Sequence, residues 1–172
     1  MYIRNATADD LPAILEIHNT AIATSTAIWT DDLTDLTERE RWFADHAERD
    51  NPVLVAETDG AVIGYAALGP WRAKTGFRHT VEDSVYVREG AQGAGVGHHL
   101  LTALLDLARS RGYHVMIADI EAGNAASIRL HERHGFQHCG TVPEVGTKFG
   151  RWLDLTVMRL QLQASDHETE IK

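Results

Sequence analysis

One stretch of the sequence constrains the fold more than any other: a buried strand, then a glycine-rich turn, then the start of a helix. Residues 84–87 read Ser-Val-Tyr-Val and predict the end of a strand. Alternate glycines follow at Gly93, Gly95 and Gly97, and an amphipathic pattern begins at Leu100. Glycines let a backbone approach a ligand closely, and the first N–H groups of a helix have no partner within it. The stretch is therefore suited to bind a phosphate or pyrophosphate.

The glycine spacing excludes two familiar phosphate-binding motifs. It does not fit G-x-G-x-x-G, because position 98 is His98. It has no Gly-Lys-Ser/Thr ending, so it is not a P-loop. An alternative stays open at this point, in which the turn serves only the fold as a tight link between a strand and a helix.

Length and composition predict one globular domain, which we expect to span residues 1–162, with a polar tail at 163–172. The 172 residues are 44% hydrophobic and 24% charged. The net charge of −9 argues against a nucleic-acid scaffold and favours a small ligand. No apolar run approaches the ~18 residues that span a bilayer, so no membrane partner is expected. We expect the lone Cys139 to be a small core residue, and a cytoplasmic location.

The order of elements predicts an α/β (α+β) fold, in which a mostly antiparallel sheet carries helices on both faces. Helices are expected after N-caps at Thr7 and Thr37, from the glycine turn to about Arg111, and over 124–134. Asp59-Gly60 predicts a hairpin between two apolar strands. Strands are expected at 1–6, 53–57, 61–68, 80–87, 113–120, 136–141 and 152–162.

Four motifs in order carry a resemblance to a known family. They are Gln92-x-x-Gly95-x-Gly97, the segment Thr-Val-Glu-Asp-Ser-Val-Tyr-Val at 80–87, the helix and turn at 124–136, and Val-Gly-Thr-Lys-Phe-Gly-Arg-Trp-Leu-Asp at 145–154. Together they resemble the GCN5-related N-acetyltransferases (GNAT), and within them the phosphinothricin and methionine sulfoximine N-acetyltransferases, a branch that includes bacterial L-amino-acid N-acyltransferases. The likeness implies about seven strands with a splayed central pair, acetyl-CoA as co-substrate, no metal, a homodimer, and a role in antibiotic or herbicide resistance.

The resemblance also implies which residues hold acetyl-CoA. The exposed backbone of the strand would bind the pantetheine arm, and the glycine turn would enclose the pyrophosphate. Arg133 would reach the CoA end, although a solvated surface arginine is an equal alternative. The implied cofactor-binding residues are Val85, Tyr86, Val87, Gln92, Gly93, Ala94, Gly95, Val96, Gly97, His98, Asn124 and Arg133.

Two side chains are the candidates for catalysis. Glu82 matches the glutamate of the family's strand segment and would remove a proton from the amine, since an ammonium has no lone pair with which to attack. The alternative is a strand-end glutamate in a salt bridge. Asp83 should point to the opposite face and is the weaker candidate. A backbone N–H near Tyr86 or Val87 would bind the oxyanion. His131 would protonate the CoA thiolate, or serve only to pack its helix.

The loop before the glutamate is the expected acceptor site, because a guanidinium binds a carboxylate or phosphinate with two hydrogen bonds. Residues 148–152 are expected to complete the pocket, from the same chain or a second subunit. The implied reaction is direct acetyl transfer to the α-amine of small amino acids or analogues. The alternatives are another amine (a polyamine, an aminoglycoside or a protein N-terminus) and a catalytically silent acyl-CoA-binding module. The implied substrate-binding residues are Trp29, Arg72, Thr75, Gly76, Phe77, Arg78 and Glu82.

Overall fold

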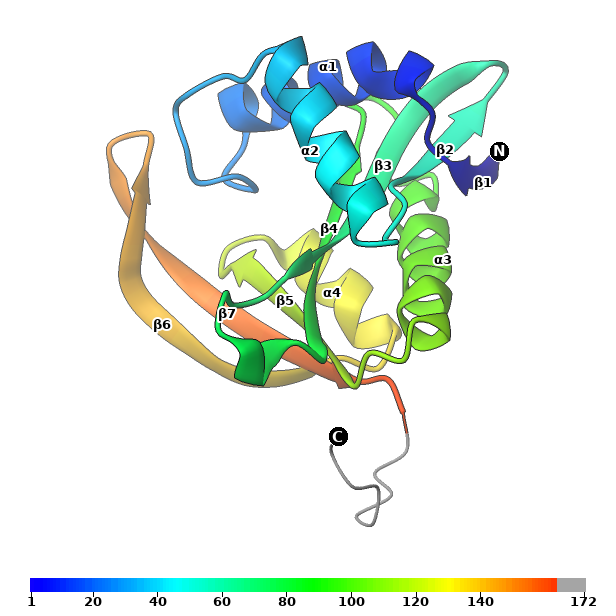
Figure 1. The fold of residues 1–172 in the computed structure, drawn as a ribbon. Helices are drawn as coiled ribbons and strands as arrows, with labels where there is room; N and C mark the ends of the chain where they lie inside the picture. The colour runs from blue at the N-terminus through cyan, green and yellow to red at the C-terminus, as the bar shows by residue number, and fades with distance from the viewer. Residues whose placement is uncertain (164–172) are drawn as a thin grey trace.

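The computed structural model describes residues 1–163, in which seven strands form one mixed sheet with helices on both faces (Figure 1). The expected tail lies almost wholly outside the described residues. The sheet order is β1-β2-β3-β4-β5-β7-β6, and every neighbouring pair is antiparallel except β4 with β5. The strands are β1 (Tyr2–Asn5), β2 (Leu54–Thr58), β3 (Ala61–Pro70), β4 (Thr80–Val87), β5 (Val115–Glu121), β6 (Gln137–Lys148) and β7 (Arg151–Gln161). The helices are α1 (Leu11–Thr24), α2 (Leu36–Glu48), α3 (Val96–Ser110) and α4 (Ala125–Arg133).

Each face of the sheet has its own hydrophobic core. On one face α1 and α2 cover strands β2 and β3, with Ile14 and Tyr65 at most 1% exposed. On the other face the leucine stripe of α3 packs against the middle of the sheet, and α4 lies beside it. Leu100, Leu101 and Leu104 of that stripe are completely buried. The predicted class, with helices on both faces of a mostly antiparallel sheet, is confirmed.

Local sequence signals account for most element boundaries. Asp59 and Gly60 both adopt positive φ (50° and 77°), as expected for a two-residue hairpin turn between β2 and β3. Thr7 caps the first helical turn, where its N–H donates to the Asp10 carboxylate at 2.7 Å. That turn, residues 8–10, is a 3₁₀ helix that leads directly into α1.

Three expectations were wrong. Asp35, and not Thr37, caps α2, because its Oδ1 accepts the Glu38 N–H at 2.9 Å. Strand β6 runs to Lys148 and not to residue 141, because two bulges, at residues 138–140 and 142–146, absorb the irregular stretches and let the pairing with β7 continue. Cys139 lies on this strand and is exposed, not buried.

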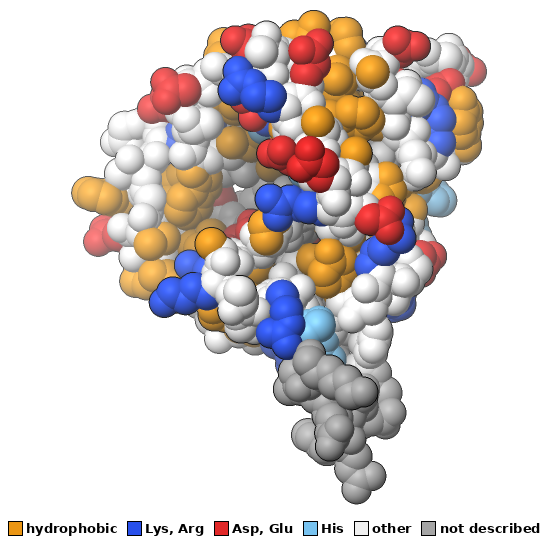
Figure 2. Space-filling view, viewed as in Figure 1, with side chains coloured by type: hydrophobic (Ala, Val, Ile, Leu, Met, Phe, Trp, Pro, Cys, Tyr) orange, Lys and Arg blue, Asp and Glu red, His pale blue; other side chains and the backbone are white. Residues whose placement is uncertain are grey.

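The β6–β7 hairpin is long and curved, and its tip folds back towards the loop that joins α1 and α2 (Figure 1). The buried ammonium of Lys148 donates to the carbonyls of Ile22 and Ile28, at 2.6 Å each. Gly146 lies directly against the Trp29 ring, where an added Cβ would come within 2.2 Å of a ring carbon. These contacts close the molecule around a central hollow, which Figure 2 shows beside the hairpin.

Candidate active site

The two parallel strands at the centre of the sheet separate halfway along. β4 and β5 pair only from Thr80 with Val115 to Glu82 with Ile117, although β4 continues to Val87 and β5 to Glu121. Beyond Glu82, the backbone groups of β4 that do not face β3 therefore face a gap. The splayed central pair that the resemblance implied is present.

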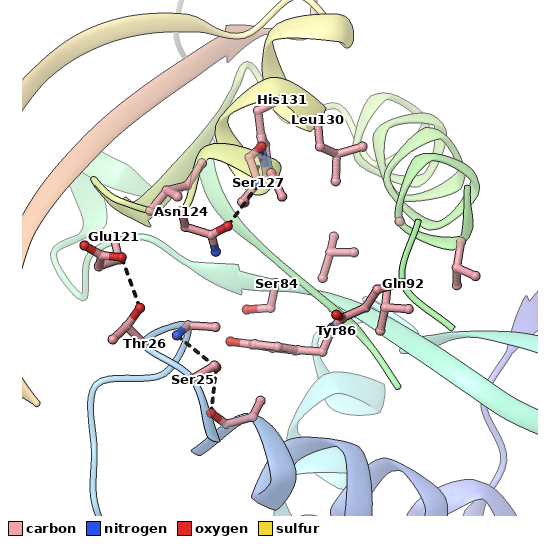
Figure 3. Close-up of a pocket in the computed structure, with 18 of the residues that line it drawn as sticks. Ser25, Thr26, Ser84, Tyr86, Gln92, Glu121, Asn124, Ser127, Leu130 and His131 are labelled. Carbon is pink, nitrogen blue, oxygen red and sulfur yellow. Dashed lines mark hydrogen bonds between the residues drawn. The ribbon is translucent and has the colours of Figure 1, made fainter. Parts of the chain in front are cut away.

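A cavity of about 1110 Å³ fills this fork. It reaches both faces of the sheet, since its lining includes Asp83 and Val85 from one face of β4 and Ser84 and Tyr86 from the other. Figure 3 shows α4 on one side of the cavity and the loop after α1, with Ser25 and Thr26, on the other. Of the twelve predicted cofactor-binding residues, only Ala94 does not border the cavity.

The glycine turn presents helix N–H groups to the cavity. Gly95 has φ of +81° and is the N-cap of α3, a left-handed conformation that favours glycine. The first helical bond runs from the His99 N–H to the Gly95 carbonyl, so the N–H groups of residues 96–98 have no partner within the helix. Gly97 allows α4 to pack closely, because an added Cβ would lie 3.3 Å from Leu130. The turn can therefore hold a pyrophosphate while α3 and α4 form its walls.

Asn124 joins the cavity from the start of α4. Its Oδ1 accepts the Ser127 N–H at 3.1 Å, as the N-cap of the helix (Figure 3). This bond fixes the side-chain amide so that its NH₂ group can donate into the cavity. Arg133 is exposed at the cavity rim.

Asp83 and His131 form a buried pair beneath the fork. Their Oδ2 and Nε2 atoms are 3.0 Å apart, and their side chains are 3% and 4% exposed. His131 Nδ1 lies 2.7 Å from the Ser127 carbonyl oxygen, so both ring nitrogens face acceptors. Burial lowers the pKa of His131, but the Asp83 carboxylate and the Ser127 carbonyl outweigh it and raise the pKa overall. The pair is best described as an imidazolium beside a carboxylate.

Glu82 lies on the opposite face of β4 from Asp83, as predicted. It is half-buried and does not border the large cavity itself. Burial raises its pKa to about 7, helped by the charges of Asp119 and Asp83 and opposed by Arg72. A carboxylate with this pKa can accept a proton near neutral pH.

The acceptor loop packs on itself next to Glu82. The Arg72 guanidinium stacks over the Trp71 ring at 4.8 Å, and Phe77 meets that ring edge-on at 5.4 Å. Thr75, Gly76 and Arg78 are exposed in the same loop, in and just after a 3₁₀ turn. This loop does not border the cavity. Arg72 influences Glu82 through its charge, which lowers the pKa of the Glu82 carboxyl.

Trp29 does not border the cavity itself but holds the loop that does, and the hairpin tip contributes two lining residues. The Trp29 indole N–H donates to the Thr26 carbonyl at 2.9 Å. Figure 3 shows the next bond, in which Thr26 Oγ1 donates to Glu121 at 3.0 Å. Phe149 and Arg151 border the cavity from this same chain. Sequence reasoning missed Ser25, Thr26 and Glu121, because only the folded hairpin and loop bring them to the fork.

Three further observations concern metal ligands, a histidine contact and membrane-spanning helices. Among the described residues, no three His, Cys, Asp or Glu side chains are grouped so as to hold a metal ion. His18, on the α1 face that packs on the sheet, makes a hydrogen bond with the Tyr65 hydroxyl at 2.8 Å. Within residues 1–163, no helix has both the length and the apolar character of a membrane span.

Known proteins share this architecture and much of the sequence. The sequence profile of the acetyltransferase (GNAT) family matches residues 14–136. The chain is 54% identical to an L-methionine sulfoximine/L-methionine sulfone acetyltransferase of Pseudomonas aeruginosa, over 93% of this chain and 94% of that one.

Two solved structures superpose on nearly the whole chain. An acetyltransferase from Salmonella typhimurium, solved with its cofactor acetyl-CoA, has a TM-score of 0.94 at 51% identity, covering 95% of each chain. A ribosomal-protein-alanine N-acetyltransferase from Brucella melitensis has a TM-score of 0.92 at 52% identity, covering 94% of this chain and 99% of that one. The fork, the glycine turn and these similarities together show that the chain belongs to the GNAT family of acetyl-CoA-dependent acetyltransferases.

Proposed function

We propose that this enzyme transfers an acetyl group from acetyl-CoA directly to the α-amine of small amino acids or their analogues, such as methionine sulfoximine, methionine sulfone and phosphinothricin. The observation that carries the proposal is the half-buried Glu82, in the last pair before the strands separate, with the charge of Arg72 within electrostatic reach. The Arg72 charge lowers the pKa that burial raises in Glu82. A base and a guanidinium in one neighbourhood match the two ends of an amino acid, an ammonium and a carboxylate.

Glu82 is the proposed base. Its carboxylate attracts the substrate ammonium and accepts a proton, directly or through a water molecule, which frees the lone pair for attack. A pKa of about 7 keeps a useful fraction of Glu82 ionised at neutral pH while making it a better base than an exposed glutamate. When bound, acetyl-CoA supplies the acetyl thioester that the amine attacks.

The backbone of β4 is the proposed oxyanion site. Because β5 does not pair with residues 83–87, an N–H near Tyr86 or Val87 can donate to the carbonyl oxygen as negative charge develops on it. The same edge would bind the pantetheine arm as an added strand would, and residues 92–98 would hold the pyrophosphate. Their cavity-facing positions support both assignments.

His131 is proposed to balance the charge of the departing thiolate. Its Nε2–H is directed at Asp83 and its Nδ1–H at the Ser127 carbonyl. A buried imidazolium therefore stabilises nearby negative charge without giving up its proton. For His131 to protonate the thiolate, the hydrogen bond from its Nε2–H to Asp83 must first break. Direct transfer needs no acyl-enzyme, and Cys139 does not border the cavity.

The acceptor carboxylate is proposed to bind Arg72 and Arg78, with the backbone and side chains of Thr75, Gly76 and Phe77 around it. Trp29 would close the far side by holding the loop after α1. Acetylation of phosphinothricin or methionine sulfoximine would make the cell resistant to those compounds.

A homodimer is proposed from the hairpin surface. Val142, Val145, Phe149 and Trp152 are 45%, 52%, 55% and 64% exposed on β6, β7 and the turn between them. Figure 2 shows hydrophobic side chains gathered over this edge of the molecule. A second copy would cover them. Light scattering should give a dimer mass for the wild type and a monomer mass for Trp152→Glu; a monomeric wild type would refute the dimer.

Thiol release from acetyl-CoA, measured over a panel of amines, tests the function. We expect turnover with methionine sulfone, methionine sulfoximine and phosphinothricin, and little with spermidine or an aminoglycoside. A peptide that begins with alanine belongs in the panel, because the Brucella melitensis relative carries the name of a protein N-acetyltransferase. A marked preference for that peptide or a polyamine would refute the amino-acid proposal. Binding of acetyl-CoA with no thiol released for any amine would identify a silent binding module.

A further inference from the structure

Asp119 lies on the same face of the fork as Glu82. In β5 the alternate residues Met116, Ala118 and Ile120 are buried in the core beneath α3, so Ile117, Asp119 and Glu121 point to the other face. Ile117 is the register partner of Glu82, in the last pair before the strands separate. Asp119 is therefore one step further along the same face, where the gap has opened.

Asp119 borders the cavity, and the protein bonds its carboxylate only weakly. Its Oδ1 is buried and makes no hydrogen bond among the described residues, and the Trp71 N–H that influences this carboxylate is likewise buried without a partner there. Glu121, two residues further on, differs, because its carboxylate accepts bonds from Thr26 Oγ1 at 3.0 Å and from the Gly123 N–H at 2.9 Å. The protein therefore bonds the Asp119 carboxylate less completely than the Glu121 carboxylate, and an ammonium bound in the cavity can add a donor to it.

The charges around the two carboxylates favour a cation there. Of the neighbouring charges, that of Asp119 raises the pKa of Glu82 the most. Burial raises the pKa of Asp119, and the Trp71 N–H and Arg72 oppose this. Asp83 adds a further negative charge near both groups. On the neighbouring β7, Arg159 is the register partner of Ile117 and bonds Gln161.

Two carboxylates on one face of the fork allow a division of roles. Glu82 is the proposed proton acceptor and loses its charge when the amine is deprotonated. Asp119 keeps its charge at that moment. One carboxylate can thus accept the proton while the other continues to hold the amine.

We propose that Asp119 is a further substrate-binding residue of this enzyme, where its carboxylate holds the ammonium group of the amine substrate beside Glu82. The inference deepens the proposed function and rests on it. It predicts a preference for amines that arrive as cations with a carboxylate on the neighbouring carbon.

The test is Asp119→Asn, with Asp106→Asn as the matched control. Asp106 is 72% exposed on α3 and pairs with Arg109, three residues away, at 3.3 Å. In Asp119→Asn we expect the KM for methionine sulfone to rise about tenfold, the value of one hydrogen bond to a charged group. The KM for acetyl-CoA should not change. Carbon-13 NMR should show a lower pKa for Glu82, and Asp119→Glu should restore both values towards the wild type.

The outcomes separate the inference from the function. An active wild type with an unchanged amine KM and Glu82 pKa in Asp119→Asn refutes the role of Asp119 and leaves the function standing. A wild type that releases no thiol with any amino acid refutes the function, and the inference with it. Thermal melting checks that each variant folds, and Asp119→Ser replaces Asp119→Asn if the latter does not.

Discussion

The carboxylate of Asp83 and the imidazole of His131 form a buried pair that joins the central strand to α4, with Oδ2 and Nε2 3.0 Å apart. The pair ties the strand that would hold the thioester to the helix whose N-cap, Asn124, borders the same cavity. Because Asp83 points away from Glu82, one dipeptide of β4 supplies a charge to each side of the fork. Glu82 and the carboxylate that holds His131 thus lie on adjacent residues of one strand.

Asp83→Asn should destabilise the fold in a pH-dependent way. The pKa of His131 is raised in the folded state, so the stabilisation is complete below its ordinary value of ~6.5 and is lost as the pH rises through the folded value. We expect a loss of about 3 kcal/mol in urea unfolding at pH 6 and a smaller loss at pH 9. His138→Gln, which removes an exposed pair with Glu132, should change little. Equal losses at both pH values would contradict an imidazolium.

Glu82→Gln should remove the proton acceptor. In the wild type kcat/KM should increase as the pH rises through about 7, because only the ionised carboxylate accepts a proton and the pKa of Glu82 is about 7. The variant should be slower by roughly 100-fold or more at pH 8 and lack that transition. The measurement is thiol release between pH 5.5 and 9 at saturating acetyl-CoA. Activity equal to the wild type across this range would remove Glu82 from the role of base.

Much of the fold could be predicted from short-range patterns. The Asp59-Gly60 hairpin, the leucine stripe of α3 and the glycine turn are each encoded within a few neighbouring residues. The prediction failed where tertiary contacts override local preference. The strand expected at 136–141 continues to Lys148, past Gly140 and Pro143, because bulges against β7 absorb the extra residues.

The site was predictable where one segment carries the whole motif. The turn at 92–98 lines the cavity as expected, apart from Ala94. Asp119 and Glu121 could not be found in this way, because their place depends on where β5 leaves β4. The sequence predicted that Asp83 faces away from Glu82 and is the weaker candidate for the base. Its direction was correct, but the sequence did not predict its pairing with His131. The residue roles, the dimer and the cytoplasmic location remain predictions.

Lys148→Met should weaken both the fold and amine binding. Lys148 is 2% exposed, and its ammonium satisfies the carbonyls of Ile22 and Ile28. Methionine fills similar space but leaves both carbonyls without a donor, so we expect a loss of roughly 2 kcal/mol in urea unfolding. The loop carrying Ser25 and Thr26 should loosen, which raises the amine KM several-fold. Lys74→Met, at an exposed lysine, is the stability control. Wild-type stability in Lys148→Met would show that the contact is dispensable.

Gly95→Ala should weaken acetyl-CoA binding through the backbone alone. The residue has φ of +81°, and the only contact of an added Cβ would be His99 at 4.0 Å, so the change strains the turn without a clash. Gly60→Ala is the matched control, since Gly60 has φ of +77° in an open hairpin turn. Both variants should lose about 1 kcal/mol in urea unfolding. Only Gly95→Ala should raise the KM for acetyl-CoA, because only its turn directs helix N–H groups at the pyrophosphate. Equal KM values for the two variants would refute pyrophosphate binding at this turn.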